Sequence, residues 1–363
     1  MAKRVSVDKW LFGVTLLLVL IGLVMVFSAS AVIAKDRFGS PYYFMLRQTL
    51  WAFAGLAAMF VMTRVDYRKL QHPAVVYTLV SVTTLLLLSV FLLDRSHNTH
   101  RWIKLGAFSF QPSELAKPAI ILYLAYFLST RVKEIDDWRR TLLPAAIPTL
   151  LFTLLIVKQP DLGTAMACCA ISASVLFVAG MHPKYLGYAL IASALPLYLL
   201  IFRTPWRYQR ILAFLNPYAD PQGSGFHMIQ SLIAVGTGGF AGRGLMEGKQ
   251  KLFYLPEPQT DFIYAVIAEE WGLIGSIIIV LLFAFFCYRG LRCAMRTRDY
   301  FARFLALGIT AMVGVQAFFN ISVVLGMLPT KGIPLPLISY GGSSLFITLA
   351  SVGVLLNITK QTD

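Results

Sequence analysis

The chain alternates between long apolar runs and short stretches that are charged or rich in proline and glycine. A helix needs about 20 mostly apolar residues to cross the hydrocarbon core of a bilayer. The pattern predicts ten such helices, near residues 10–33, 48–63, 73–93, 113–130, 142–158, 164–180, 186–202, 262–287, 303–328 and 338–358. We therefore expect an all-α, polytopic membrane protein in which residues 1–363 form a single integral-membrane domain.

Composition supports this class and excludes an ordinary soluble enzyme. Hydrophobic residues make up 58% of the 363 residues and charged residues only 13%, which is more apolar surface than a soluble domain can bury. The net charge of +15 would indicate a nucleic-acid partner in a soluble chain. In a membrane protein such an excess reflects cationic loops beside anionic lipids, so we expect no nucleic acid.

The distribution of arginine predicts an orientation. Five arginines lie between Arg289 and Arg303, and short loops rich in Lys and Arg remain in the cytoplasm. With ten helices, both termini are then cytoplasmic, and the long segment of about residues 203–261 between the seventh and eighth helices faces outward. Connections of this length in compact proteins tend to be functional.

Several ionisable residues fall in or beside apolar runs, where each is costly and needs a partner or a task. Glu114 and Lys117 are three residues apart, so they share a helix face either as an ion pair that holds the bundle or as groups that meet a charged ligand. Asp161 fits a helix cap or a cavity wall. Glu269 and Glu270 are adjacent on a helix, and structural hydrogen bonding is the favoured interpretation for them.

Two further polar residues lie at the outer ends of helices. Asp261 directly precedes the eighth predicted helix, where Thr260 fits the N-cap and the helix dipole favours an acid. A carboxylate at this depth is also where a general base for a lipid-headgroup hydroxyl would lie. Lys331 is the candidate ligand of the proline-containing segment Pro329–Ser344, since irregular backbone at membrane depth is buried in protein or lines a wet cavity.

One glycine-rich stretch has a superficial likeness to a phosphate-binding loop. In Gly236–Gly244 no strand precedes the glycines and no Gly-Lys-Ser/Thr follows them, so nucleotide binding is not expected. Its backbone amides and Arg243 could still contact an anion. The histidines and cysteines show no metal-ligand spacing.

Taken together, these motifs resemble the SEDS family, the FtsW/RodA group, over nearly the whole chain. The stretches that carry the resemblance are Gly22–Ser30, Gln111–Lys117, Gln159–Thr164, Leu255–Glu257 with Thr260–Phe262, Ala268–Gly272 and Gly332–Ser344. Lys249–Pro256 and Pro329–Gly332 are more similar to the cell-division branch (FtsW) than to the elongation branch (RodA). Gln259 departs from the family, which more often has a histidine before the Thr-Asp pair.

The resemblance implies a function, partners and a site. Members of this family polymerise lipid II into glycan strands on the outer side of the bacterial cytoplasmic membrane, usually with a class B penicillin-binding protein and with other proteins of the division or elongation complex. The family's essential acid corresponds to Asp261. By the same resemblance Glu114, Lys117 and Asp161 line a central cavity.

This reaction requires one base for the acceptor hydroxyl and cations that stabilise the departing pyrophosphate. The acceptor 4-hydroxyl must lose a proton as it attacks the anomeric carbon and displaces polyprenyl pyrophosphate, with inversion and no covalent nucleophile. Asp261 supplies the base if burial or closure raises its pKa. The candidate partners of the anion are Lys117, Arg101, Arg210, Arg243 and Lys331, or a divalent cation, Mg²⁺ or Mn²⁺, that bridges the pyrophosphate.

Two other functions fit the same sequence. A flippase that moves lipid II across the bilayer would share the cavity but would give Asp261 no proton to transfer. A non-catalytic scaffold of the division complex would tolerate the loss of Asp261, Glu114 and Lys117. Strand synthesis, lipid II translocation and genetic complementation separate the three functions.

Overall fold

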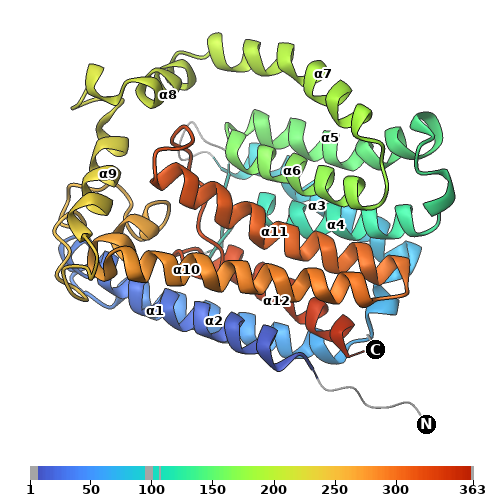
Figure 1. Ribbon diagram of the computed structural model, residues 1–363, viewed down its shortest axis with the longest axis horizontal. Coiled ribbons are helices and arrows are strands. Elements are labelled where there is room, and N and C mark those ends of the chain that lie inside the picture. Colours follow the sequence, from blue (N-terminus) through green and yellow to red (C-terminus); the bar gives the residue numbers. More distant parts are fainter. Residues whose placement is uncertain (1–6, 95–100, 106–107, 361–363) are drawn as a thin grey trace.

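A computed structural model describes residues 7–94, 101–105 and 108–360 of the chain. Its long helices run side by side as one bundle, with both ends of the described chain at the same end of the bundle (Figure 1). The long helices are α1 (Lys9–Phe38), α2 (Tyr43–Arg64), α3 (Pro73–Leu93), α4 (Pro112–Ser129), α5 (Leu143–Lys158), α6 (Leu162–Val178), α7 (Pro183–Phe202), α10 (Ile263–Arg296), α11 (Tyr300–Val324) and α12 (Gly342–Thr359).

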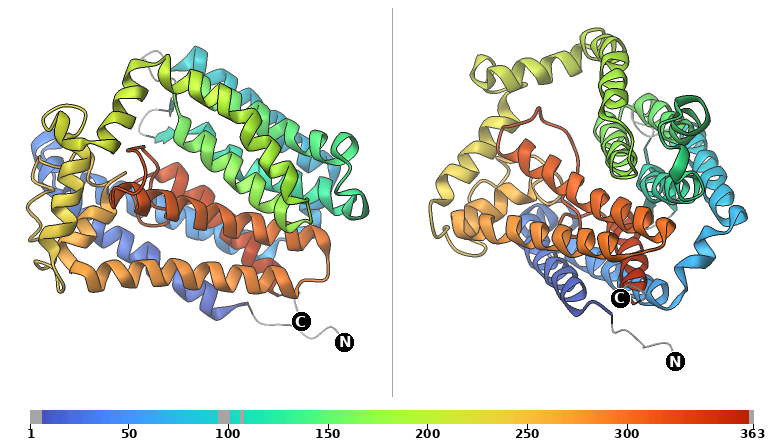
Figure 2. Two further views of the ribbon diagram at one scale, coloured as in Figure 1. Left: turned by 45° about the horizontal axis from the view of Figure 1, so that its top comes forward. Right: turned by 45° about the vertical axis from the view of Figure 1, so that its right-hand side comes forward.

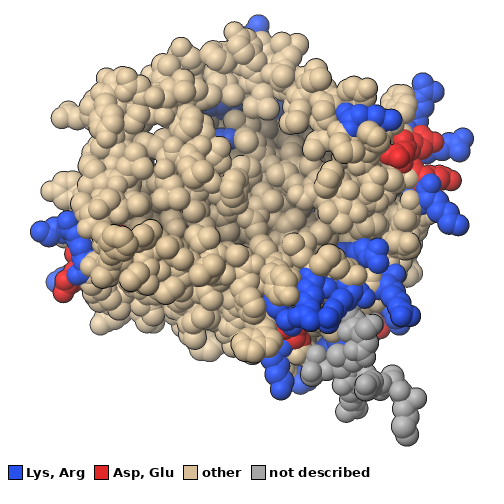
Figure 3. All heavy atoms as spheres, viewed as in Figure 1, with Lys and Arg blue, Asp and Glu red and all other residues tan. Residues whose placement is uncertain are grey.

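The bundle has the character of a membrane domain. Among the described residues, eight helices are long and apolar enough to cross a bilayer. The other two of the long helices are α4, which carries Glu114 and Lys117, and the 17-residue helix α6. On the face shown in Figure 3, most of the charged side chains gather at two opposite ends of the molecule, with a wide uncharged band between them.

The core of the bundle is formed by α4, α11 and α12. α12 packs along α2, while α11 packs between α10 and α4. By contrast, α7 contributes no buried residue, although its composition is as apolar as that of its neighbours. Figure 2 shows α7 standing away from the rest of the bundle; residues 179–182 join it to α6, and α8 (Pro205–Leu215) follows its other end.

The end of the bundle that lies away from the two termini is covered by one β-hairpin and by the segment between α7 and α10. The segment contains α8, a 3₁₀ turn η4 (Pro217–Ala219) and α9 (Phe226–Gly238). The hairpin pairs β1 (Ile103–Leu105) with β2 (Phe108–Phe110) in antiparallel register, ahead of α4. Three further short helical turns, η1 (Tyr67–Gln71), η2 (Val132–Glu134) and η3 (Trp138–Leu142), connect helices at the opposite end.

The ten predicted apolar runs each coincide with a helix, but some predicted boundaries are wrong. The arginine-rich linker is shorter than predicted because α10 continues to Arg296, so Arg289, Arg292 and Arg296 lie on its last turns. Only residues 297–299 separate α10 from α11. Arg289 forms an ion pair of 2.5 Å with Asp8, the N-cap of α1, so this basic end of α10 lies beside the N-terminus.

Candidate active site

Asp261 lies where three cavities meet, in the turn directly before α10. The cavities have volumes of about 300, 540 and 680 Å³, and both Asp261 and Gly332 line all three of them. We name them the outer cavity, the hairpin cavity and the lateral cavity, in that order. A carboxylate at such a junction can be approached by substrate groups from more than one direction.

The lateral cavity, the largest of the three, combines cationic and apolar walls. Its apolar wall includes Leu197 and Ile201 of α7 and Met166 of α6. Its cations are Arg101, Arg207, Arg210 and Lys331, and its acids are Asp161 and Asp261. Four cations against two carboxylates leave this cavity positive, so it suits an anionic headgroup joined to an apolar chain.

Two of these arginines project from the same face of α8. Arg207 and Arg210 are three residues apart, and both guanidinium groups lie over the ring of Trp206, at 4.9 Å and 5.3 Å from its centroid. Arg207 is absent from the sequence-based candidates. Its spacing from Arg210 on a short helix is the signal that could have indicated it.

The hairpin cavity lies on the other side of Asp261. It is lined by Arg47 and Trp51 of α2, by Lys104 of β1, and by Tyr340 with the residues that begin α12. Glu114, Asp161 and Arg101 also face this cavity. Because its three cations are matched by Glu114, Asp161 and Asp261, it is close to neutral.

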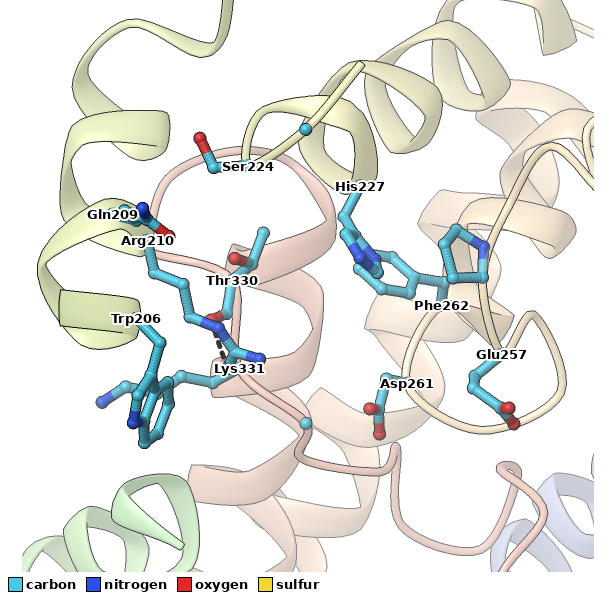
Figure 4. A pocket seen from close by; sticks show the side chains of 13 residues that line it. Trp206, Gln209, Arg210, Ser224, His227, Glu257, Asp261, Phe262, Thr330 and Lys331 are labelled. Carbon is cyan, nitrogen blue, oxygen red and sulfur yellow. Dashed lines mark hydrogen bonds between the residues drawn. The ribbon is translucent and has the colours of Figure 1, made fainter. Parts of the chain in front are cut away.

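Figure 4 shows the outer cavity from close by. Arg210 and Lys331 lie on one side of it, and Asp261 and Glu257 lie on the other. A terminal nitrogen of Arg210 donates to the carbonyl of Thr330 at 3.5 Å, which ties α8 to the segment that carries Lys331. The two signs of charge therefore face each other across a space that a polar substrate group can enter.

The electrostatic environment of Asp261 suits a base. Burial of its carboxyl, with Glu257 and Asp161 nearby, raises the pKa of Asp261 to about 7, although Arg101 and Arg210 oppose the shift. Within the described parts of the chain, no hydrogen bond to this carboxylate is found. It is thus available to accept a proton, as a general base must be.

Lys331 also has an altered pKa. Burial lowers the pKa of its ammonium to about 8, and the repulsion of Arg210 and Arg207 adds to this effect, while Asp161 opposes it. The side chain remains mostly protonated at neutral pH. A pyrophosphate in the lateral cavity would stabilise the charged form further.

Glu114 and Lys117 form the predicted ion pair on α4. The Lys117 ammonium lies 2.7 Å from the Glu114 carboxylate, and only 2–3% of either residue is exposed. Glu114 faces the hairpin cavity, whereas Lys117 lines none of the three. Lys117 therefore neutralises Glu114 on the side away from the cavity. The predicted ion pair is confirmed, and contact of Glu114 with a charged ligand stays a prediction.

Asp161 and Arg101 occupy the wall between the hairpin and lateral cavities. Asp161 is the N-cap of α6: its carboxylate accepts from the Thr164 amide at 3.1 Å and from the Thr164 hydroxyl at 2.8 Å. Arg101 donates to the carbonyls of Gln159 and Pro160. Asp161 is thus both a cap and a cavity residue.

Arg243 does not join this group. Its guanidinium lies 3.8 Å from the carboxylate of Glu269, and the residue lines none of the three cavities. Glu269 and Glu270 are buried and form structural hydrogen bonds, as expected, and these bonds hold residues 246–251 of the segment between α9 and α10.

The structure also corrects the predicted cap of α10. The N-cap position belongs to Phe262, which provides no capping side chain, and the Thr260 hydroxyl instead donates to the carbonyl of Glu257 at 3.2 Å. The prediction that Thr260 caps this helix is wrong because the N-cap position lies two residues later, at Phe262. Asp261 therefore lies in the turn, where its side chain can enter the cavities.

The donor set around Asp261 does not fit a metal held by the protein alone. In the described ranges, no three His, Cys, Asp or Glu side chains come together as a cluster that could hold a metal ion. Mg²⁺ and Mn²⁺ favour several oxygen ligands, and the described residues offer them no cluster of three such side chains.

Comparisons with known proteins were made for the whole chain. The family model FtsW/RodA/SpoVE, described as "Cell cycle protein", matches residues 8–363. The probable peptidoglycan glycosyltransferase FtsW of Geobacter metallireducens is 45% identical over 344 residues, which cover 94% of this chain and 91% of that protein. Stage V sporulation protein E of Bacillus subtilis is 44% identical over 364 residues and covers 99% of both chains.

Two solved structures are similar over 98% of both chains. One belongs to work on the structural coordination of polymerization and crosslinking by a peptidoglycan synthase complex, with a TM-score of 0.81 and 32% identity. The other is the rod shape determining protein RodA of Thermus thermophilus, with a TM-score of 0.72 and 29% identity.

Proposed function

The chain belongs to the FtsW/RodA/SpoVE family, and from this premise we propose that Asp261 is the general base with which it joins lipid-linked sugars. The chain is a peptidoglycan glycosyltransferase of cell wall synthesis and a multi-pass protein of the inner membrane. Its identity of 45% to an FtsW, against 29% to a RodA, supports the cell-division branch.

We also propose a membrane topology, which the helices and the charges support. In our proposal all ten long helices cross the bilayer, both termini lie in the cytoplasm, and Asp261 faces outward. The uncharged band in Figure 3 and the arginines at the end of α10 beside the N-terminus support this arrangement. The site then opens at the depth of the lipid headgroups, where a lipid-linked sugar presents its reactive groups.

The observation that carries the mechanism is the position of Asp261 at the junction of three cavities. The acceptor 4-hydroxyl attacks the anomeric carbon of the donor, and its proton passes to the Asp261 carboxylate. The new C–O bond forms as the bond to the pyrophosphate oxygen breaks, and that oxygen keeps the electron pair. A base with a pKa near the working pH combines adequate ionisation with adequate strength.

The leaving pyrophosphate is bound in the lateral cavity in this proposal. Arg101, Arg207, Arg210 and Lys331 surround that cavity, and the apolar residues of α6 and α7 beside it suit the start of a polyprenyl chain. Cations placed before the reaction stabilise the charge that develops on the departing oxygen. Lys117 is already paired with Glu114, and Arg243 lies elsewhere, so neither is assigned to the pyrophosphate.

A divalent cation is not needed to describe what these side chains do. If Mg²⁺ or Mn²⁺ takes part, the phosphate oxygens of the substrate supply most of its ligands, since the protein offers no cluster of three among the residues that the structure describes. The proton transfer proposed here uses Asp261 alone.

We also propose a class B penicillin-binding protein as the partner. The similar structure with 32% identity comes from a complex that couples polymerization to crosslinking, which supports a crosslinking partner for this chain. Lipid II and the growing glycan strand are the proposed substrates, and other proteins of the division complex are further proposed partners.

The test compares two activities in the same liposomes. We expect the wild-type protein with its partner to convert lipid II into glycan strands, and Asp261→Asn to bind the partner and make no strands. Headgroup translocation is measured in parallel by the accessibility of labelled lipid II. Strands at the wild-type level from Asp261→Asn would contradict the base assignment, and translocation by the wild type without any strands would indicate a flippase.

A further inference from the structure

The turn that carries Asp261 is held by donors from distant parts of the chain. The three consecutive carbonyls of residues 259–261 each accept one hydrogen bond from α11 or from the segment before α12. The bonds are Tyr340 N to Gln259 O at 2.8 Å, Ser339 Oγ to Thr260 O at 2.5 Å, and Asn320 Nδ2 to Asp261 O at 2.8 Å. A turn of irregular backbone is thereby fixed on one side along its whole length.

Asn320 makes a second bond that joins two segments. Its Nδ2 also donates to the carbonyl of Ile333 at 2.8 Å, so one buried amide connects the turn of Asp261 with the segment that contains Gly332. Asn320 is only 2% exposed, and its Oδ1 is buried with no hydrogen-bond partner in the described structure. The side chain therefore acts only as a donor, which is a costly arrangement unless the two bonds matter.

Gly332 lies directly against the carboxylate. A Cβ added to Gly332 would be 2.7 Å from Oδ2 of Asp261, which is closer than carbon and oxygen atoms pack, and 3.4 Å from Cγ of the same residue. Any side chain at position 332 would therefore displace the carboxylate from its place. Gly332 also lines all three cavities, so its lack of a side chain keeps their junction open.

We propose that Asn320 and Gly332 are positioning residues for the reaction. Asn320 holds the main chain of Asp261 against the segment around Ile333, and Gly332 leaves the space in which the carboxylate stands at the junction of the cavities. The inference rests on the proposed function of Asp261 as base. A base displaced by about 1 Å can cost roughly a hundredfold in rate.

The experiment measures strand synthesis from lipid II over a range of pH for the full chain with its partner. The test variants are Gly332→Ala and Asn320→Leu. Each test variant has a control variant in which the same substitution is made at a residue away from the cavities. Gly236→Ala on α9 adds a methyl group where nothing lies within 4 Å. Asn357→Leu removes a buried amide that donates to Thr63 O at 2.8 Å, at the other end of the bundle.

We expect both test variants to lose about 10- to 100-fold in kcat with an unchanged KM for lipid II. In both, the carboxylate leaves the buried place that raises its pKa, so we expect the acid side of the pH–rate profile to shift to lower pH. The controls keep the wild-type profile, even where Asn357→Leu lowers thermal stability. A merely structural role would lower stability in the test variants without moving the profile.

The two proposals fail in different ways. If Asp261→Asn makes no strands in the same assay while Gly332→Ala and Asn320→Leu keep the wild-type rate and profile, the positioning role is wrong and the base assignment stands. A many-fold rise in KM would also contradict positioning, because it would make Gly332 a substrate contact. If Asp261→Asn makes strands normally, the proposed function itself fails.

Discussion

An aspartate in water is ionised at neutral pH but binds a proton too weakly to be an efficient base for a sugar hydroxyl. An efficient base must be ionised at the working pH and must also bind a proton firmly. Asp261 meets both requirements, because burial of its carboxyl and the nearby acids Glu257 and Asp161 raise its pKa to about 7. Near neutral pH a large fraction is then ionised, and the ionised form is a stronger base than an ordinary aspartate. The environment of one side chain thus accounts for the proposed role.

Glu257 offers a direct test of this environment. Its negative charge is one of the causes that raise the pKa of Asp261, so Glu257→Gln lowers that pKa. The ionised base then persists to lower pH, and the acid side of the pH–rate profile shifts to lower pH. Because Glu257 is exposed and water screens its charge, we expect a shift of less than about one pH unit.

Glu247→Gln is the matched control, since Glu247 is an exposed acid of the same outward segment and is not among the groups that shift Asp261. An equal shift in both variants would show a general effect of net charge rather than a local one. No shift in Glu257→Gln would contradict the account of the Asp261 pKa.

At the scale of single residues, the sequence predicted the candidate base but not the residues that we propose position it. Asp261, Glu114, Asp161 and Lys331 are recognisable because charged residues beside apolar runs are costly. Asn320 and Gly332 are ordinary in composition, and only the fold brings them to Asp261. Arg243 shows the converse case, since proximity in the sequence to Asp261 did not bring it into the cavities.

The segment between α9 and α10 is attached to the bundle by buried carboxylates of α10. Glu270 accepts from Ser28 of α1 at 2.6 Å, from the amide of Met246 at 3.0 Å and from the ammonium of Lys251 at 2.5 Å. Glu269 accepts from the amide of Lys249 at 2.8 Å. These bonds anchor the residues that lead into the turn of Asp261, so the helix positions the site although it does not react.

Removal of this anchor lowers stability. Glu270→Ala leaves the Lys251 ammonium buried without a carboxylate, which costs about 3–5 kcal/mol for a broken buried pair. We expect a clearly lower thermal unfolding midpoint in detergent. Lys251→Met combined with Glu270→Leu removes both charges and restores part of the loss. Equal midpoints for the single and double variants would contradict the ion-pair explanation.

The apolar runs of the sequence predicted the positions of the helices well but predicted their ends poorly. Each predicted run became a helix because burial in lipid or protein demands it, but α10 extends through Arg296 since arginine is a good helix former. The break at Gly272, with a φ of 65°, lies inside this helix and could not be read from composition. The main chain of Phe240 and Gly242 lies against Gly272, in the space that a side chain would need.

For the whole molecule, two groups of positive charge among the described residues bear on the proposed function. One is the end of α10 and its surroundings, beside the N-terminus, and the other is the lateral cavity near Asp261. The first supports the proposed orientation in the membrane, and the second suits a pyrophosphate-linked lipid. The apolar helix α7, which has no buried residue, forms one wall of that cavity.

The measurement that tests the central claim most directly is the pH dependence of kcat/KM for strand synthesis from lipid II. For the wild-type protein with its partner, the account predicts a rate that rises with pH through about 7, because Asp261 must lose its proton before it can act as base. For Asp261→Asn it predicts no strands at any pH. A wild-type profile that is flat across neutral pH, or strands from Asp261→Asn at the wild-type rate, would contradict it.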